Sequence, residues 1–176
     1  MEENVIRIGV VGLGRGTAIA RELFTIPGTK LVAACDHNPE ILEKGYKELS
    51  DLAGYEVVGM AYPCGGVNND DRVAELIRRH TGVKYARTTT TNNCFDLQQN
   101  LYRFDPTSYH HDFDSMTRLA EEFIQMKPDK PQIFYIWGHS YEQDFRSDHW
   151  VKLEEFFKLI SGHDDIFYGT NTEVLL

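Results

Sequence analysis

The chain has 176 residues, of which 41% are hydrophobic and 26% charged, and its formal net charge is −9. This composition is typical of one globular domain, and the acidic balance disfavours nucleic acid as a partner. No apolar run reaches the roughly 20 residues of a membrane helix, and no secretory pattern is present, so we expect a cytoplasmic protein with no membrane partner. Three cysteines without CxxC spacing favour reduced thiols. The sequence does not indicate an oligomeric state.

The first third of the chain predicts two strands, each followed by a helix. Residues 5–11 and 30–35 are short apolar runs, which are typical of buried strands. Residues 17–25 between them carry apolar side chains at helical spacing. Asn38, which precedes a proline, predicts the cap of the second helix, because its side chain accepts a hydrogen bond from a free amide. Gly54 ends that helix.

The rest of the chain continues the alternation. The expected strands are 56–62, 85–89, 132–137 and 166–168. The expected helices are one capped by Asn69 or Asp70, one over 113–126 and one over 147–161. Residues 90–112 have no clear period, and a loop of that length usually serves a site. Because strands alternate with helices, we predict a single α/β domain over residues 1–176, with a mainly parallel sheet covered by helices.

A glycine-rich turn connects the first strand to the first helix. Gly12 permits the tight turn, and Gly14 lets the backbone approach a pyrophosphate at the helix N-terminus. Thr17 holds the usual position of a third glycine, with Gly16 one residue early. Asp36 closes the second strand, where a carboxylate can bind both ribose hydroxyls of NAD and repel a 2′-phosphate. The pattern predicts an NAD site, and a glycine-rich turn without a ligand is the alternative.

The segments IRIGVVGLGRG and LVAACDHNPE resemble the start of the Gfo/Idh/MocA family of NAD(P)-dependent sugar oxidoreductases. The resemblance covers residues about 1–40 and implies a Rossmann-like βαβ segment. That family continues with an EKP motif that carries a catalytic lysine, and with a separate substrate domain. The chain has no EKP motif, so the resemblance implies only the half of the site that binds adenosine and pyrophosphate.

The motifs in the rest of the chain resemble a different family. They are YKELSDLAGYEVVGMAYPCGG, GVKYARTT, FYIWGHSYE and the tail that begins at Trp150. Over residues about 46–176 they resemble the later part of the polysaccharide deacetylase (NodB-homology) family. The resemblance implies a partial (β/α) barrel over residues 41–176, joined to the Rossmann-like start, and hydrolysis of carbohydrate amides or esters.

The same resemblance implies catalytic roles for particular residues. Cys64 in the Pro-Cys-Gly turn corresponds to the residue whose backbone N–H faces the oxyanion. His139 corresponds to the acid that protonates the leaving nitrogen, with Glu142 or Asp144 to orient it. The family's TFDDG and H-[ST]-x-x-H motifs, which supply the base and the metal ligands, do not occur in the chain. Because the site would lack the source of its nucleophile, we expect weak or no hydrolysis.

We assign no metal ligands. Zinc would be bound only if Asp36, His37 and a third ligand converge. The adjacent His110 and His111 would face opposite sides of a strand, and surface positions are more common for such residues than metal binding. The candidate contacts for a sugar or another small ligand are aromatic side chains. These are Tyr102, Phe104, Tyr109 and Tyr141.

The two resemblances meet inside one helix, near residues 38–46. We interpret the chain as a chimera, engineered or recombined, and a natural remnant or a gene-model error are the alternatives. Three functions are compatible with the sequence. One is a deacetylase-like carbohydrate hydrolase of weak or no activity, the second is an NAD-binding module of oxidoreductase ancestry, and the third is a fold without enzymatic activity.

Overall fold

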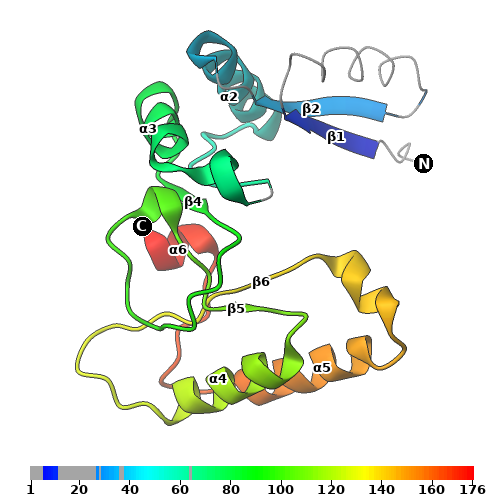
Figure 1. Ribbon diagram of the computed structural model, residues 1–176, viewed down its shortest axis with the longest axis vertical. Coiled ribbons are helices and arrows are strands. Elements are labelled where there is room, and N and C mark those ends of the chain that lie inside the picture. Colours follow the sequence, from blue (N-terminus) through cyan, green and yellow to red (C-terminus); the bar gives the residue numbers. More distant parts are fainter. Residues whose placement is uncertain (1–5, 12–26, 28, 36–37, 64) are drawn as a thin grey trace.

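The computed structural model describes residues 6–11, 27, 29–35, 38–63 and 65–176. Their helices and strands form three successive groups, which follow one another along the longest axis of the molecule (Figure 1). Each group contains one pair of parallel strands. The α/β class and the parallel pairing agree with the prediction from the sequence.

The first group contains β1 (Ile6–Val11), β2 (Thr29–Cys35) and α2 (Pro39–Ala53). β1 and β2 run parallel, as a βαβ start requires. The cap predicted at Asn38 is confirmed, because its side chain accepts a hydrogen bond from the Glu40 amide at 3.0 Å. Gly54 ends the helix in the left-handed conformation, with φ of +75°, which glycine adopts without strain. The helix predicted over 17–25 lies outside the described residues.

The second group contains β3 (Gly59–Ala61), η1 (Gly66–Asn69), α3 (Asp71–His80), β4 (Tyr85–Arg87) and η2 (Leu101–Arg103). Of the two predicted caps, Asp70 is the one that forms, because its side chain accepts a hydrogen bond from the Val73 amide at 2.8 Å. α2 packs against this group through a shared apolar core. The core residues are Leu42, Tyr62, Ile77, Val83 and Ala86.

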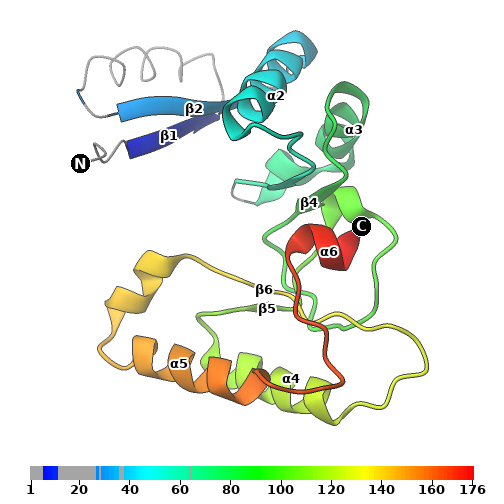
Figure 2. The same cartoon turned by 180° about the vertical axis from the view of Figure 1, so that it is seen from behind.

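The third group contains β5 (Ser108–Tyr109), α4 (Phe113–Gln125), β6 (Ile136–Trp137), η3 (Ser140–Phe145) and α5 (His149–Ile160). The last helix, α6 (Asn171–Leu175), lies at the level of β4 along the long axis (Figure 1). α4 and α5 lie side by side in both views (Figures 1 and 2). The residues between them form a second apolar core. Its buried members are Phe113, Met116, Ala120 and Phe156.

The prediction of one continuous sheet and a partial barrel is not confirmed. In the described part of the chain the strands form three separate two-stranded sheets, and no sheet closes. The strand predicted over 132–137 is limited to β6. Its earlier amides find other partners, since the Ile133 amide donates to the Phe95 carbonyl at 2.7 Å and the Tyr135 amide to the Thr107 hydroxyl at 3.1 Å.

Residues 166–168 were expected to form a last strand, and they do not. The Ile166 amide donates to the His163 carbonyl at 3.2 Å, which is a turn contact. A strand needs a neighbouring strand to pair with, and no described segment pairs with these residues.

The long loop predicted over 90–112 contains more structure than the sequence indicates. It includes η2 and β5, and Phe104 within it is 1% exposed. The Asp105 amide donates to the Gln98 side chain at 2.8 Å, and that side chain donates back to the Asp105 carbonyl at 2.7 Å. Among all the helices described in the chain, each is too short or too polar to cross a bilayer.

Candidate functional site

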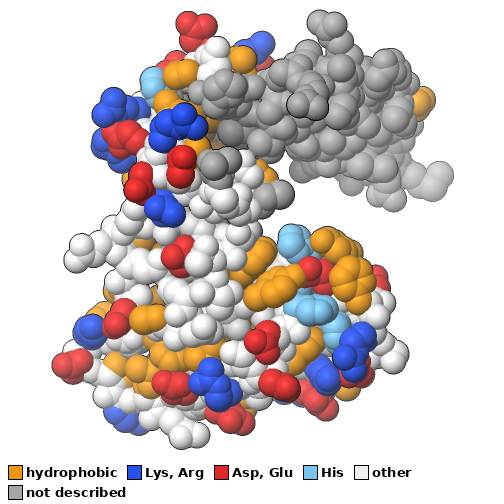
Figure 3. All heavy atoms as spheres, viewed as in Figure 1, with side chains coloured by type: hydrophobic (Ala, Val, Ile, Leu, Met, Phe, Trp, Pro, Cys, Tyr) orange, Lys and Arg blue, Asp and Glu red, His pale blue; other side chains and the backbone are white. Residues whose placement is uncertain are grey.

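Polar side chains converge where β5 and β6 end. The strands are parallel neighbours, and the His110 amide donates to the Trp137 carbonyl at 2.9 Å. Residues that follow the two strands therefore lie at one edge of the pair, and parallel sheets often bind ligands at this edge. Histidine side chains gather among hydrophobic ones on this part of the surface (Figure 3). We call the group the Glu142 cluster, and its members are Tyr109, His110, His139, Glu142 and Gln143.

The Glu142 carboxylate is the centre of the cluster and is 8% exposed. Its Oε2 atom lies 2.9 Å from His110 Nε2 and 3.2 Å from His139 Nδ1, and it accepts the His139 backbone N–H at 3.2 Å. Its Oε1 atom accepts the Tyr109 hydroxyl. Burial raises the pKa of Glu142, but the hydrogen bonds that it accepts outweigh burial and lower the pKa to about 2. Glu142 is therefore ionised at neutral pH.

The local backbone explains why Glu142 meets His139. His139 is the N-cap of η3, and Glu142 is its third residue, so the two side chains share one face of the turn. Each side chain hydrogen-bonds the backbone of the other residue, as in a capping box. Tyr109 approaches from β5, and burial together with the nearby carboxylate raises the pKa of its hydroxyl. Tyr109 therefore stays a hydrogen-bond donor.

Gly138 allows the backbone of the β6 end to lie against the His110 ring. A Cβ atom on Gly138 would lie 2.1 Å from His110 Cδ2, which no real contact permits. The absence of a side chain at this position thus lets the imidazole reach Glu142. The sequence alone does not indicate that the glycine between Trp137 and His139 contacts a histidine ring.

His110 and His111 were expected to face opposite sides of a strand, but they lie in the turn after β5, where His110 is buried and His111 is exposed. The expectation of surface positions for both is wrong, since His110 is 8% exposed and contacts Gln143, which is fully buried. Sequence reasoning missed that His110 and Gln143 belong to the site. The signal available for His110 was the alternation of side chains in β5, which continues to residue 110 and turns it inward.

His139, predicted to be the acid, has its side chain 46% exposed while its Nδ1 contacts Glu142. The sequence left Glu142 and Asp144 as alternative partners. The structure favours Glu142, because Asp144 accepts a hydrogen bond from Trp150 Nε1 at 2.8 Å instead. His139 therefore combines a fixed Nδ1 with a ring that remains accessible.

Aromatic rings surround the exposed side of His139. Tyr141 is 59% exposed, with its ring centroid 5.3 Å from that of His139. On the other side, the Trp137 ring lies 5.6 Å from His139, and the Arg87 guanidinium lies 4.5 Å over that ring. Tyr141 remains a candidate for sugar contact.

The other predicted sugar contacts are placed differently. Phe104 is 1% exposed, so its prediction as a sugar contact is wrong. Tyr102 packs against the core of the second group. Tyr109 is committed to Glu142 by its hydroxyl.

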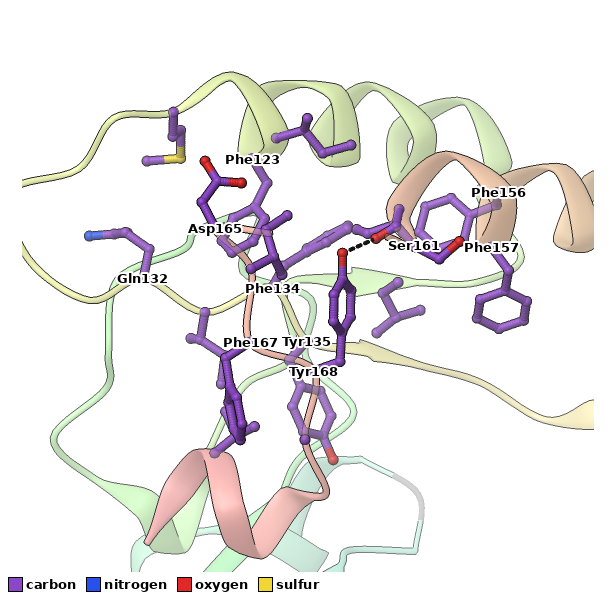
Figure 4. A pocket seen from close by; sticks show the side chains of 18 of the residues that line it. Phe123, Gln132, Phe134, Tyr135, Phe156, Phe157, Ser161, Asp165, Phe167 and Tyr168 are labelled. Carbon is purple, nitrogen blue, oxygen red and sulfur yellow. Dashed lines mark hydrogen bonds between the residues drawn. The ribbon is translucent and has the colours of Figure 1, made fainter. Parts of the chain in front are cut away.

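A large cavity lies apart from the Glu142 cluster. It has a volume of about 1590 Å³ and lies between α4, α5 and the segment before α6 (Figure 4). Its walls include the aromatic side chains of Phe123, Phe134, Phe156 and Phe167. The Tyr168 hydroxyl, also in this wall, donates to the Ile160 carbonyl at 2.8 Å. Its titratable side chains include two exposed ion pairs, Lys127 with Asp165 at 3.0 Å and Lys158 with Glu154 at 2.6 Å. The Glu142 carboxylate is buried instead, so the chemistry of the chain is better placed there.

Several predicted site residues lie outside the described residues. They are Gly12, Gly14, Gly16, Thr17, Asp36, His37 and Cys64. The NAD site and the oxyanion turn thus stay predictions. Within the described ranges, no three His, Cys, Asp or Glu side chains are placed to bind one metal ion, so these residues do not fit a deacetylase-type metal.

Comparison with known proteins gives one informative match. Glycosyl hydrolase family 109 protein 1 of Phocaeicola vulgatus is 35% identical over 78 residues, which are 44% of this chain and 15% of that protein. The chain thus spans a small part of the length of this curated relative. No family model and no solved structure matches the chain. The relative is of the Gfo/Idh/MocA type, so the match supports the oxidoreductase-like start of the chain and gives no support to the deacetylase-like part.

Proposed function

We propose that the chain acts on carbohydrates and that His139 is a general acid for an amide or ester bond of an acylated saccharide. One observation carries the proposal. The Glu142 carboxylate holds His139 Nδ1 at 3.2 Å while the imidazole stays about half exposed. A carboxylate in this position orients the ring and stabilises its charged form, which leaves Nε2 to give a proton to a leaving group.

Two further features support carbohydrate as the substrate class. The curated relative is named as a glycosyl hydrolase, and the exposed Tyr141 ring beside His139 offers an apolar face of the kind on which a sugar ring can pack. General acid catalysis contributes about 100- to 10,000-fold to a rate. The motifs that supply a base and metal in the deacetylase family are absent from the sequence, so we expect slow hydrolysis.

The test compares two substrates that differ in their need for an acid. The nitrophenolate of a nitrophenyl acetate leaves as an anion without protonation, whereas the amine of an N-acetylglucosamine oligosaccharide needs a proton on its nitrogen to leave. We expect His139→Asn to slow release of acetate from the oligosaccharide by about 100-fold and to leave the nitrophenyl ester nearly unchanged. His80→Asn is the matched control, because His80 lies on α3 and pairs with Glu43 instead. Equal oligosaccharide rates for His139→Asn and the parent protein would contradict the proposal.

A second candidate function is NAD binding by the first 40 residues. The specific observation is the parallel pairing of β1 with β2, which is the arrangement that a dinucleotide-binding βαβ unit needs. The match to a Gfo/Idh/MocA-type protein favours the same interpretation. In this proposal the turn from Gly12 to Thr17 approaches the pyrophosphate, and Asp36 binds the ribose.

Melting curves with and without millimolar NAD test this second candidate. NAD or ADP-ribose should raise the melting temperature, and Asp36→Ala should abolish the increase. Without any increase in the parent protein the candidate fails. If the hydrolysis test is negative as well, a fold without enzymatic activity is the remaining interpretation.

A further inference from the structure

Arg87 ends β4 as a half-buried side chain whose charge no carboxylate neutralises in the described part of the chain. Burial lowers the pKa of its guanidinium, which nevertheless stays charged at any ordinary pH. Lys47, Arg72 and Lys84 also lack an ion pair with a described residue, but they are exposed and remain hydrated. A charge that is partly removed from water without a counter-charge costs free energy, so Arg87 is difficult to explain by stability alone.

The neighbouring phenol does not supply the missing negative charge. Tyr135 is the titratable side chain that interacts electrostatically with Arg87. Burial raises the pKa of the Tyr135 hydroxyl, and this effect outweighs the opposite effect of the guanidinium. Tyr135 is therefore neutral at ordinary pH and leaves the positive charge of Arg87 unbalanced.

The hydrogen-bonding atoms of Arg87 are only partly used. Nη1 donates to the Thr88 carbonyl at 2.8 Å, which holds the guanidinium in place. Nε and Nη2 donate to no described residue, and neither atom is sealed from solvent. Their N–H bonds form a planar fork that matches the two oxygens of a carboxylate. The free edge of the guanidinium can thus bind one anion through two hydrogen bonds.

Trp137 provides the ring over which this guanidinium lies. The guanidinium carbon is 4.5 Å from the ring centroid, which is within the range of a cation–π contact. The Nε1–H group of Trp137 is buried and finds no acceptor among the described residues. Both members of the contact therefore have donors without an acceptor, and together they give this part of the molecule a local positive potential.

Arg87 lies at the same edge of the strands as the Glu142 cluster. It ends β4 and forms a parallel bridge with Phe104, in the segment that leads into β5. Tyr109 and Trp137 end β5 and β6, and the Trp137 ring lies 5.6 Å from the His139 ring. The guanidinium carbon is therefore at most about 10 Å from the His139 ring. A disaccharide reaches across such a distance, so one substrate can contact both side chains.

We propose that Arg87 binds the carboxylate of an acidic saccharide whose acyl group lies at His139. Arg87 then determines specificity, because it contacts the substrate away from the bond that His139 protonates. Trp137 and the Thr88 carbonyl keep the guanidinium in position. The inference rests on the proposed function for the place of the acyl group, whereas the preference for an acidic saccharide is measured by binding alone.

Two disaccharides that differ in one group test the proposal in the parent protein. The first joins glucuronic acid to N-acetylglucosamine, and in the second a primary amide replaces the carboxylate. NMR titration of the tryptophan indole signals measures both affinities without any need for hydrolysis. We expect the acid to bind about tenfold more tightly than the amide and to shift the Trp137 signal. Equal affinities, or no binding of the acid at millimolar concentration, would overturn the proposal.

A third ligand separates a carboxylate from another anion of the same charge. It is a disaccharide of N-acetylglucosamine that carries one sulfate. We expect this ligand to bind more weakly than the glucuronic acid disaccharide, because the planar fork fits a carboxylate. Tighter binding of the sulfate would overturn the assignment of a carboxylate.

Substitutions of Arg87 show whether the preference belongs to this side chain. Arg87→Met removes the fork at similar length, so the acid and the amide should bind about equally. Arg72→Met is the matched control, because Arg72 of α3 is an exposed arginine without an ion pair to a described residue, and it should keep the tenfold preference. A folded Arg87→Met protein with the full preference would overturn the proposal.

Arg87→Lys keeps the test decisive if Arg87→Met does not fold. It retains the charge and loses the planar fork, so we expect a smaller preference for the acid than in the parent protein. An Arg87→Lys protein with the full preference would contradict binding through the fork. A purely structural role for Arg87 predicts that each variant changes the affinities for the acid and the amide by the same factor.

The outcomes separate this inference from the proposed function. Preferred binding of the acid with no detectable hydrolysis would support the role of Arg87 and reject the general acid. Hydrolysis that depends on His139, with equal affinities for the acid and the amide, would reject the role of Arg87 alone.

Discussion

The second and third groups share one plan, a parallel strand pair with helices packed on it, yet they bury different side chains. The second group is closed by an apolar core, and its charged residues pair at the surface, as Glu75 does with Arg78 at 2.7 Å. The third group has an apolar core as well, but it also buries His110, Glu142 and Gln143. Burying a charge costs free energy unless it is fully paired, so the polar cluster is difficult to explain by stability alone. The difference locates the candidate chemistry in the third group.

Replacement of the central carboxylate should have the largest effect. Glu142→Gln leaves the two histidines and Tyr109 without their shared partner, and we expect a loss of about 3–5 kcal/mol in the free energy of unfolding. Urea unfolding measures this loss. Glu154→Gln is the matched control, because Glu154 pairs with Lys158 at the surface, and its loss should be about half a kcal/mol or less. Similar losses in Glu142→Gln and Glu154→Gln would contradict a larger contribution of the buried carboxylate to stability.

Acid should destabilise the third group through the same residue. The pKa of Glu142 falls from its ordinary value of 4.5 to about 2 on folding. A depressed folded pKa contributes stability that is present above pH 4.5 and is lost as the pH falls toward 2. The loss is about 3 kcal/mol. Urea titrations across this range should show it in the parent protein, and Glu142→Gln should show less.

Two glycines allow a direct comparison of the groups. Alanine at Gly59 would place Cβ 2.0 Å from the Tyr85 ring tip, and alanine at Gly138 would place it 2.1 Å from the His110 ring. Each should cost about 1–3 kcal/mol, measured by urea unfolding, and Gly138→Ala should cost more, because His110 is held by Glu142 and cannot swing aside. Of the two variants, only Gly138→Ala should move the NMR signals of His139. A change of these signals in Gly59→Ala would contradict the placement of the candidate site in the third group.

The smallest expected effect concerns helix caps. The Asp70 side chain caps α3 through the Val73 amide, whereas Asp148 begins α5 without a side-chain cap. Asp70→Ala should cost about 1 kcal/mol, and Asp148→Ala only a few tenths from its ion pair with Lys152. Thermal unfolding of Asp70→Ala and Asp148→Ala measures the two losses of stability.

Local features of the fold could be predicted from the sequence, and contacts between distant segments could not. The caps at Asn38 and Asp70 depend on residues within one turn, so they could be predicted from the sequence. The strand over 132–137 was overestimated, because its amides bond to Phe95 and Thr107, which lie far away in the chain.

The candidate site shows the same division. The family resemblance implied Glu142 or Asp144 as the partner of His139, but the choice of Glu142 depends on the Trp150 side chain donating a hydrogen bond to Asp144. His110 and Gln143 joined the site only through the approach of β5 to β6. No pattern within one segment specifies that approach.

The aromatic wall of the large cavity has a consequence for handling the protein in solution. Phe167 is 72% exposed and Phe157 is 56% exposed, and both belong to that wall. Copies of the chain with a net charge of −9 repel one another, which keeps such apolar surfaces apart. The repulsion vanishes near the isoelectric point of 5.2, where exposed apolar patches promote precipitation. Solubility should therefore pass through a minimum close to that pH and recover on either side of it.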